Sequence, residues 1–330
     1  MALLAGIDEA GYGPHLGPLV VAAAALEFPR GALPDPDLWE ALRDHVRKSP
    51  AGRDARVIVC DSKLAYAPAR GLANLERAVL GFLAAAGVRP ATLAELLEAV
   101  AVPSGDSDLP AKAPAAEPWH QPQALVLPAA ATAEDIDSAA ARFDAGLAAI
   151  GGRVGRIWAS LAPAARLNRL MEGGRRNKAE ALFSLNADLL AELGQHAGGQ
   201  AVHVTIDRHG GRRFYGGLLA RAFPMHAVTA LEESAARSRY RLVAGGGAAP
   251  MDLTICERCE SWSLAAALAS MAAKYVRELQ MQQLNAFFAA RVPGLRPTAG
   301  YGLDAWRFLE DVAAARAAAG VPDEAILRSR

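Results

Sequence analysis

The sequence predicts a protein of the α/β or mixed α+β class. Short apolar runs typical of buried strands alternate with longer segments whose apolar residues recur at helical spacing. The chain has 330 residues, of which 52% are hydrophobic and 21% are charged. A chain of this size and composition buries a large core, which excludes a disordered, collagen-like or coiled-coil protein.

The first elements that we expect are the two strands of a hairpin. An apolar run over residues 3–7 ends at Asp8, Glu9 and a glycine-rich turn, and a second apolar run extends over 19–28. The first strand is expected to be central and buried. The next expected elements are a helix over 38–46, a strand over 57–60 and a helix over 72–86.

The middle of the chain contains a stretch unlike the rest. Residues 103–128 are rich in Pro, Ala, Ser and Asp, and their prolines are too closely spaced for a helix or a central strand. We interpret this stretch as an insertion or a mobile loop. The pattern beyond it predicts a helix over 135–150, a strand over 155–158, a helix over 177–193 and a strand over 201–206 that leads into Asp207.

The last part of the chain is expected to be mainly helical. Residues 240–243 and 253–256 flank three consecutive glycines and predict a hairpin. Long Ala-rich patterns then predict helices over 263–288 and 304–319, so that 263–330 forms a helical portion.

Charge, cysteine content and the length of the apolar runs indicate which partners and which cellular compartment to expect. The 35 basic residues balance the 35 acidic ones, so any electrostatic binding must come from local patches. The cysteines Cys60, Cys256 and Cys259 are too few for a disulfide framework and leave one unpaired, which favours the reducing cytoplasm. The apolar run over 19–26 is far shorter than the roughly 20 residues of a membrane helix, so no membrane segment is expected.

Four carboxylates stand where secondary-structure elements begin or end. Asp8 and Glu9 end one apolar strand, Asp207 ends another, and Glu260 opens a helix after the second hairpin. Such ends meet at one edge of an α/β sheet, and closely packed carboxylates require compensation by divalent cations. The chemistry indicated is two-metal phosphodiester hydrolysis. A single Asp at a strand end is more often a turn or helix cap, but the adjacent Asp-Glu pair after a buried strand favours the metal site.

Local basic clusters are compatible with a phosphate-bearing substrate. Arginines interleaved with aromatic residues suit contacts to phosphates and stacking on bases, and a solvated charged face is the alternative for each cluster. One cluster contains Arg166, Arg169, Arg175, Arg176 and Lys178, and the other contains Arg208, Arg212 and Arg213 beside Phe214 and Tyr215.

The motifs resemble those of the ribonuclease HII/HIII family, the type 2 ribonucleases H. The segment over residues 6–14, GIDEAGYGP, is similar to the opening motif of that family. Further similarities follow in the same order along the chain. They are Asp61-Ser62-Lys63, Ile206-Asp207, Arg258-Cys259-Glu260, Ala269-Ser270-Met271-Ala272-Ala273-Lys274 and Gly300-Tyr301-Gly302.

The resemblance implies a single RNase H-like catalytic domain over 1–330, with a central mixed sheet flanked by helices. It also implies Mg²⁺- or Mn²⁺-dependent cleavage of the RNA strand of an RNA/DNA hybrid or of a duplex that contains a ribonucleotide. Asp8, Glu9, Asp207 and Glu260 would then be the catalytic metal ligands. Lys63, Tyr301 and the turn of Gly11, Tyr12 and Gly13 would contact the substrate, where a glycine backbone can approach the ribose 2′-hydroxyl.

Several features depart from the family pattern. Tyr12 stands where the HII branch usually has Arg, Glu260 stands in place of Asp, and Glu278 competes with Glu260 as fourth ligand. Segments near 30–56, 94–128 and 221–254 look like insertions. Two alternatives therefore stay open: a divergent RNase H-fold nuclease acting on another structured nucleic acid, and a non-catalytic nucleic-acid-binding protein.

Other motifs give weaker indications of function. Cys256 and Cys259 form a single CxxC without the second half of a zinc site. No complete dinucleotide-binding glycine motif and no phosphate loop is present, so no nucleotide cofactor is expected. His209 follows Asp207 by two residues and is a candidate for assisting proton transfer, although such a histidine is more often a packed residue.

Overall fold

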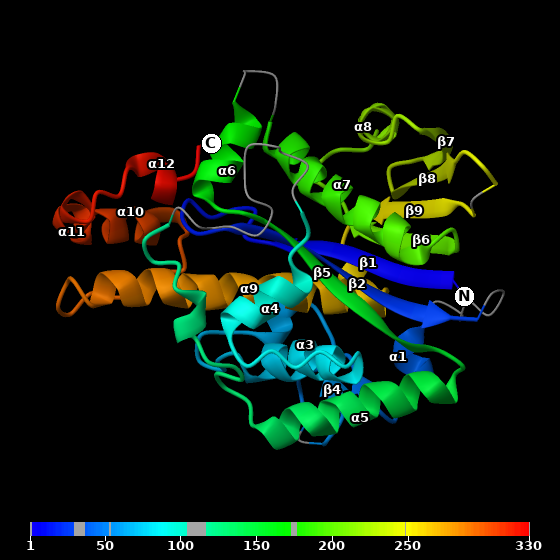
Figure 1. The fold of residues 1–330 in the computed structure, drawn as a ribbon, viewed down its shortest axis with the longest axis horizontal. Helices are drawn as coiled ribbons and strands as arrows, with labels where there is room; N and C mark the ends of the chain where they lie inside the picture. The colour runs from blue at the N-terminus through cyan, green and yellow to red at the C-terminus, as the bar shows by residue number, and fades with distance from the viewer. Residues whose placement is uncertain are drawn as a thin grey trace.

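A seven-stranded mixed sheet forms the centre of the computed structural model (Figure 1), which describes residues 2–29, 37–52, 54–103, 117–172, 177–247 and 249–329. The strand order is β5-β2-β1-β6-β9-β8-β7. Strand β1 pairs antiparallel with β2 and parallel with β6, and β6 pairs parallel with β9. The strands are β1 (Ala2–Ala10), β2 (Leu19–Phe28), β5 (Arg153–Ala162), β6 (Ala201–Asp207), β7 (His226–Glu233), β8 (Arg237–Ala244) and β9 (Met251–Cys256).

Helices cover both faces of this sheet. The helices α3 (Ala73–Ala85), α5 (Ala133–Ala149) and α9 (Leu264–Ala289) share one core with the sheet, and α7 (Lys178–Ala197) lies in the core on the other face (Figure 1). Side chains of β2 alternate between the two cores, as the pleat of a strand requires: Ala24 lies in the first and Ala23 in the second. Burial on both faces explains why β2 is a continuous apolar run. The predicted central mixed sheet flanked by helices is confirmed.

Shorter elements complete the fold. A separate two-stranded sheet pairs β3 (Val46–Arg47) with β4 (Val57–Ile58). The remaining helices are α1 (Leu38–Ala41), α2 (Ser62–Ala65), α4 (Leu93–Val100), α6 (Ala164–Met171), α8 (Gly216–Ala222), α10 (Gly302–Asp311), α11 (Ala313–Ala318) and α12 (Asp323–Ile326), with the 3₁₀ turns η1 (Pro122–Ala124) and η2 (Cys259–Ser261).

The structure corrects several boundaries. The segment 94–128, expected as an insertion with the character of a Pro/Ala-rich loop, instead begins with a helix, because Leu96, Leu97 and Val100 are buried on α4, which the Thr92 side chain caps. Its residues 104–116 lie outside the described part of the chain, as do 30–36 and 53 of the first expected insertion and 248 of the third. The helix expected over 38–46 ends at residue 41, and the last long helix is divided at Val312. The segment 221–254 adds β7 and β8 to the main sheet.

Among the described residues, no helix combines the length and the apolar character that crossing a membrane requires.

Candidate active site

The structure brings Asp8, Glu9 and Asp207 together at one edge of the sheet. Asp8 and Glu9 lie near the carboxyl end of β1, and Asp207 is the last residue of β6. Because the two strands run parallel with Ile7 opposite Ile206, their acidic ends are adjacent. Carboxylate oxygens of the three residues all lie within 4.8 Å of one another.

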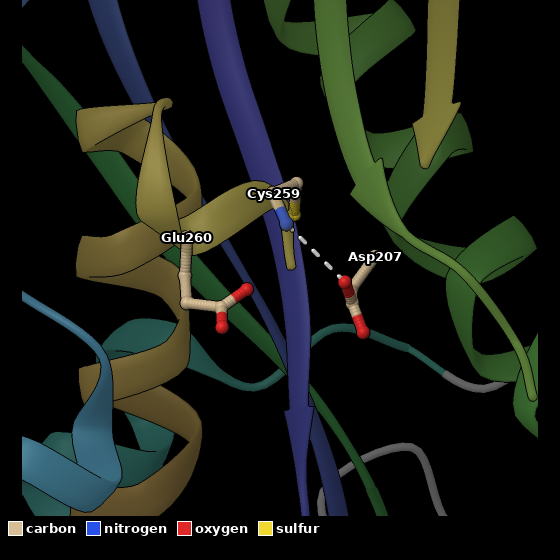
Figure 2. A group of neighbouring side chains, drawn as sticks. All are labelled: Asp207, Cys259 and Glu260. Atoms are coloured by element: carbon tan, nitrogen blue, oxygen red, sulfur yellow. Dashed lines mark hydrogen bonds between the residues drawn. The ribbon is translucent and has the colours of Figure 1, made fainter. Parts of the chain in front are cut away.

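Glu260 joins this cluster from the turn that precedes α9. Arg258 takes up a left-handed conformation, with φ of 55°, and the chain then enters η2. The Cys259 backbone N–H donates to Asp207 Oδ1 at 3.4 Å. Figure 2 shows the Asp207 and Glu260 carboxylates turned toward the same space, and ligand atoms of Asp207, Cys259 and Glu260 lie within 4.8 Å of one another. We refer to Asp8, Glu9, Asp207 and Glu260 as the carboxylate cluster.

A glycine allows α9 to approach the sheet closely enough to place Glu260. A Cβ added to Gly6 of β1 would stand 2.1 Å from the backbone nitrogen of Ala266, at the start of α9. Any larger residue at position 6 would therefore push the helix, and Glu260 with it, away from β1. This contact assigns a structural role to the glycine that opens the GIDEAGYGP segment.

The carboxylate cluster is electrostatically unfavourable when no cation compensates it. Burial, followed by the charges of Glu9 and Asp207, raises the pKa of Asp8 well above its ordinary value. Burial and the Asp207 charge raise the pKa of Glu9 to about 8. Burial also raises the pKa values of Asp207 and Glu260. The nearby Lys63 ammonium acts in the opposite direction on Glu9, Asp207 and Glu260, but it does not cancel these shifts.

The donor atoms of the cluster suit a hard divalent cation. Burial and the charges of Asp8 and Asp207 raise the pKa of the Cys259 thiol well above its ordinary value. The donor set consists of four carboxylates and this single thiol, so oxygen donors predominate. Oxygen donors favour Mg²⁺ or Mn²⁺ over softer metals.

The competing acid, Glu278, does not belong to the cluster. Its carboxylate lies 2.7 Å from Lys274 Nζ and 3.3 Å from Arg277 Nη1, so two cations already compensate its charge. Of the two candidates for fourth ligand, the structure brings Glu260 to the other acids.

Hydrogen bonds connect the predicted Asp61-Ser62-Lys63 motif to the cluster. The Ser270 hydroxyl on α9 is hydrogen-bonded to the Asp8 carboxylate, and its oxygen lies within hydrogen-bond distance, 3.1 Å, of the Ser62 hydroxyl. Ser62 begins α2, which Asp61 caps by accepting from the Lys63 backbone N–H at 2.9 Å. Ser270 was part of a recognised motif, but its bridging position could not be inferred from that motif.

The three predicted substrate-contacting residues of the glycine turn have different neighbours, and Gly13 lies beside Tyr301. Gly11 has φ of 89°, and a Cβ there would stand 2.5 Å from Arg277 Nε, so glycine is required. Gly13 is exposed, and a Cβ there would be 3.7 Å from Tyr301 Cε1. The Tyr301 ring is 47% exposed and lies 5.5 Å from the Arg277 guanidinium. Tyr12 sits beneath Lys178, whose Nζ is 5.0 Å from the ring centroid.

Two buried arginines that the sequence analysis missed hold this glycine turn, residues 11–17. Arg328, in the C-terminal segment, donates to the carbonyl oxygens of Gly11 and Gly17, the latter at 2.6 Å. Arg277, which is fully buried on α9, donates to the carbonyl oxygen of Leu16 at 3.5 Å and to that of Ala299 at 3.0 Å. The backbone N–H of Arg328 also donates to His15 O at 3.0 Å. No spacing pattern in the sequence marks either arginine.

The basic clusters separate into structural and accessible members. Arg208 is buried and bonds to Glu257 and to two backbone carbonyls, and Arg166 is buried against Asp188. His209 is also buried, and burial lowers the pKa of its ring to about 3, so the hypothesis that it transfers protons at the cluster is not favoured. Arg212, Arg213 and Lys178 remain accessible, whereas Arg175 and Arg176 lie outside the described residues.

Comparison with known proteins yields structural similarity only. No family model and no curated protein matches the sequence. The chain is similar to the ribonuclease HII of a PCNA:RNase HII complex from Archaeoglobus fulgidus, with 16% identity, a TM-score of 0.46 and coverage of 99% of this chain and 94% of that one.

Two further solved structures are similar over almost the whole chain. Ribonuclease H2 from Pyrococcus horikoshii OT3 has 14% identity and a TM-score of 0.44, and the match covers 98% of this chain and 92% of that one. Bst-RNase HIII in complex with Mn²⁺ has 15% identity and a TM-score of 0.41, and the match covers 99% of this chain and 66% of that one. Similarity at this level assigns neither an activity nor the role of any residue.

Proposed function

We propose that this protein is a metal-dependent endoribonuclease of the type 2 ribonuclease H kind, which hydrolyses the RNA strand of RNA/DNA hybrids or cuts DNA duplexes at an embedded ribonucleotide. The observation that carries the proposal is the carboxylate cluster. Four acids from three distant parts of the sequence meet at one edge of the sheet, where burial together with the Asp207 charge raises the pKa of Glu9 to about 8. A protein that only binds nucleic acid gains nothing from acids that repel one another and the phosphate backbone.

The four carboxylates are suited to holding Mg²⁺ or Mn²⁺. When bound there, divalent cations supply the charge that activates water and stabilises the leaving oxygen of a phosphodiester. Asp207 is held in place by the Cys259 N–H, and Asp8 by Ser270 and by the Glu9 N–H at 2.7 Å. These bonds fix the carboxylates before substrate arrives, which reduces the reorganisation needed during reaction.

We assign the remaining predicted residues to positioning the substrate. The Lys63 side chain is exposed, and its charge acts on three of the four acids, so a phosphate held near the cluster would lie within its reach. In the segment that follows Glu9 in the sequence, Gly13 offers an exposed backbone without a Cβ, and Tyr301 offers an exposed ring next to it. This arrangement supports recognition of a ribose and its neighbouring sugar.

A nuclease acting on another structured nucleic acid is the second candidate. It is favoured by Tyr12, whose ring lies under Lys178 at the position where an Arg is usual in the HII branch. The three buried, unpaired cysteines agree with the expected cytoplasmic setting, and no nucleotide cofactor enters the proposal.

Cleavage of two labelled duplexes tests the proposal. One has a continuous RNA strand opposite DNA and the other has a single ribonucleotide within DNA, and each is incubated with the protein in Mg²⁺ and in Mn²⁺ beside the Asp8→Asn variant. Cutting that requires the metal and is lost in the variant is the expected result. Folded wild-type protein that cuts neither duplex would exclude the proposed activity, and cutting only of another structured nucleic acid would favour the second candidate.

A further inference from the structure

A pocket opens beside the carboxylate cluster and is not used by the mechanism above. Its volume is about 580 Å³, and it lies between the N-terminal end of α7 and the loop that follows β6. Tyr12, Lys178, Arg212, Arg213 and Phe214 contribute to its wall. Tyr12 connects it to the cluster, because Glu9 and Arg212 are the charged groups that act on the Tyr12 phenol.

The wall of this pocket carries more positive than negative charge. Among the described residues, Lys178 and Arg213 form no ion pair, and Lys178 contacts the Tyr12 ring instead. Arg212 forms an ion pair with Glu180, with 3.5 Å between Arg212 Nη2 and Glu180 Oε1. Three cations thus face one carboxylate of the wall region, which leaves donors available for an anion.

An exposed aromatic ring accompanies these cations. The Phe214 side chain is 65% exposed, although it sits beside the buried Tyr215. Gly210 and Gly211 line the same pocket; Gly210 has φ of 59°, and a Cβ on either glycine would meet nothing within 4 Å, so the loop backbone is open to a ligand. Cations, accessible backbone and an exposed ring are the features that bind a phosphate together with a base or sugar.

Tyr12 of the pocket and Glu9 of the carboxylate cluster are close to each other along the chain. Tyr12 follows Glu9 by three positions, and three residues of extended chain span at most about 11 Å between Cα atoms. Successive phosphates of one strand are spaced by about 3.4 Å along a duplex axis. The separation of these two backbone positions is thus comparable to about three steps along one strand of a duplex.

We propose, on the basis of the function proposed above, that this pocket is a nucleotide subsite for the substrate duplex. Lys178, Arg212 and Arg213 bind a phosphodiester that flanks the scissile one, and Phe214 packs against the base or sugar next to it. The subsite contributes to substrate affinity and register rather than to the chemical step.

Binding without cleavage tests the subsite. A fluorescein-labelled RNA/DNA hybrid is titrated with protein in EDTA at several KCl concentrations, and fluorescence anisotropy gives Kd. The double variant Lys178→Gln/Arg213→Gln is expected to raise Kd by about tenfold and to reduce the slope of log Kd against log salt by about two, one for each cation removed. Phe214→Ala is expected to raise Kd by about tenfold with an unchanged slope, because it removes stacking but no charge.

The control removes two charges elsewhere. Arg43 and Arg89 are exposed and belong to segments that pack on the opposite face of the sheet, so Arg43→Gln/Arg89→Gln should retain the wild-type Kd and slope. A pocket variant that matches the wild type, or a control that loses as much affinity as the pocket variant, would overturn the subsite while the wild type still binds and cuts. A wild type that neither binds nor cuts the hybrid would overturn the proposed function, and the ligand of the pocket with it.

Discussion

The carboxylate cluster and the adjacent glycine turn are stabilised in opposite ways. In the cluster, burial raises the pKa values of all four acids, and neighbouring carboxylates add to the shifts of Asp8, Glu9 and Glu260. In the turn, carbonyl oxygens point at Arg277 and Arg328, so its buried polar groups are satisfied by the chain itself. The carboxylate cluster therefore requires a bound metal cation, whereas the glycine turn is stabilised by two arginines of the chain itself. Substitutions in the cluster should therefore mainly lower activity, whereas substitutions in the turn should mainly lower stability and substrate affinity.

The largest effect is expected in the cluster. Asp207→Asn retains an oxygen that can accept the Cys259 N–H but removes a metal-binding charge. We expect cleavage to fall by about 10³-fold or more, because metal-based stabilisation of the transition state amounts to several kcal/mol. Single-turnover cleavage measures this, and activity within about tenfold of the wild type would contradict the assignment.

The glycine turn should respond through stability and substrate affinity. Arg328→Gln leaves buried carbonyls of Gly11 and Gly17 without their donor, and we expect the free energy of unfolding to fall by about 2–4 kcal/mol. KM should rise while kcat changes little, since the metal ligands are unaffected. Urea unfolding and steady-state kinetics measure both, with the exposed Arg291→Gln as control. Equal stability and KM in the two variants would show that the C-terminal segment does not hold the turn.

Substitutions of Glu260 and Glu278 distinguish a metal-binding carboxylate from one that is ion-paired within the protein. Glu260→Gln should weaken Mn²⁺ binding and lower cleavage by about 10²-fold, because Glu260 lies with Asp207. Glu278→Gln should retain Mn²⁺ affinity and lose stability, because it leaves Lys274 and Arg277 without their carboxylate. Isothermal titration with Mn²⁺ distinguishes them, and the reverse order of affinities would make Glu278 the ligand.

The smallest effect is expected at Lys63. Its exposed ammonium is assigned to a substrate phosphate, so Lys63→Gln should raise KM by about tenfold and reduce the salt slope of KM by about one. Cleavage kinetics at several salt concentrations measure this. A lower kcat with an unchanged KM would instead indicate that Lys63 acts on the carboxylates.

The two regions also differ in how far the sequence predicted them. The β1–β2 hairpin, the parallel strand β6 and the acids at their ends follow from apolar runs that stop at charged residues. The convergence of Glu260 with them was inferred from its position at the start of a helix and then from its motif, and the structure places it there through the close contact between Gly6 and Ala266. Local patterns carry this information because each acid is next to the element that positions it.

The contacts of the glycine turn could not be predicted in this way. Arg328 binds a carbonyl 311 residues away, and no local pattern encodes such a contact. Strand β7 was missed for a related reason: its side chains are mostly exposed at the edge of the sheet, so it lacks the alternation that marks a half-buried strand. Helix α4 was missed because the prolines that follow it dominated the composition of its segment.

The most direct test of the account is thermal unfolding of the metal-free protein with and without Mn²⁺. The pKa of Glu9 is about 8 in the folded protein against 4.5 ordinarily, so the folded state binds more protons between these values and stability should fall as pH rises through this window. At pH 8, Mn²⁺ should raise the Tm of the wild type. Metal-free Asp8→Asn should unfold at a higher temperature than the wild type and gain little from Mn²⁺. A wild type whose Tm is independent of pH and of Mn²⁺, or an Asp8→Asn variant less stable than it, would contradict the claim that these acids form a cation-binding catalytic site.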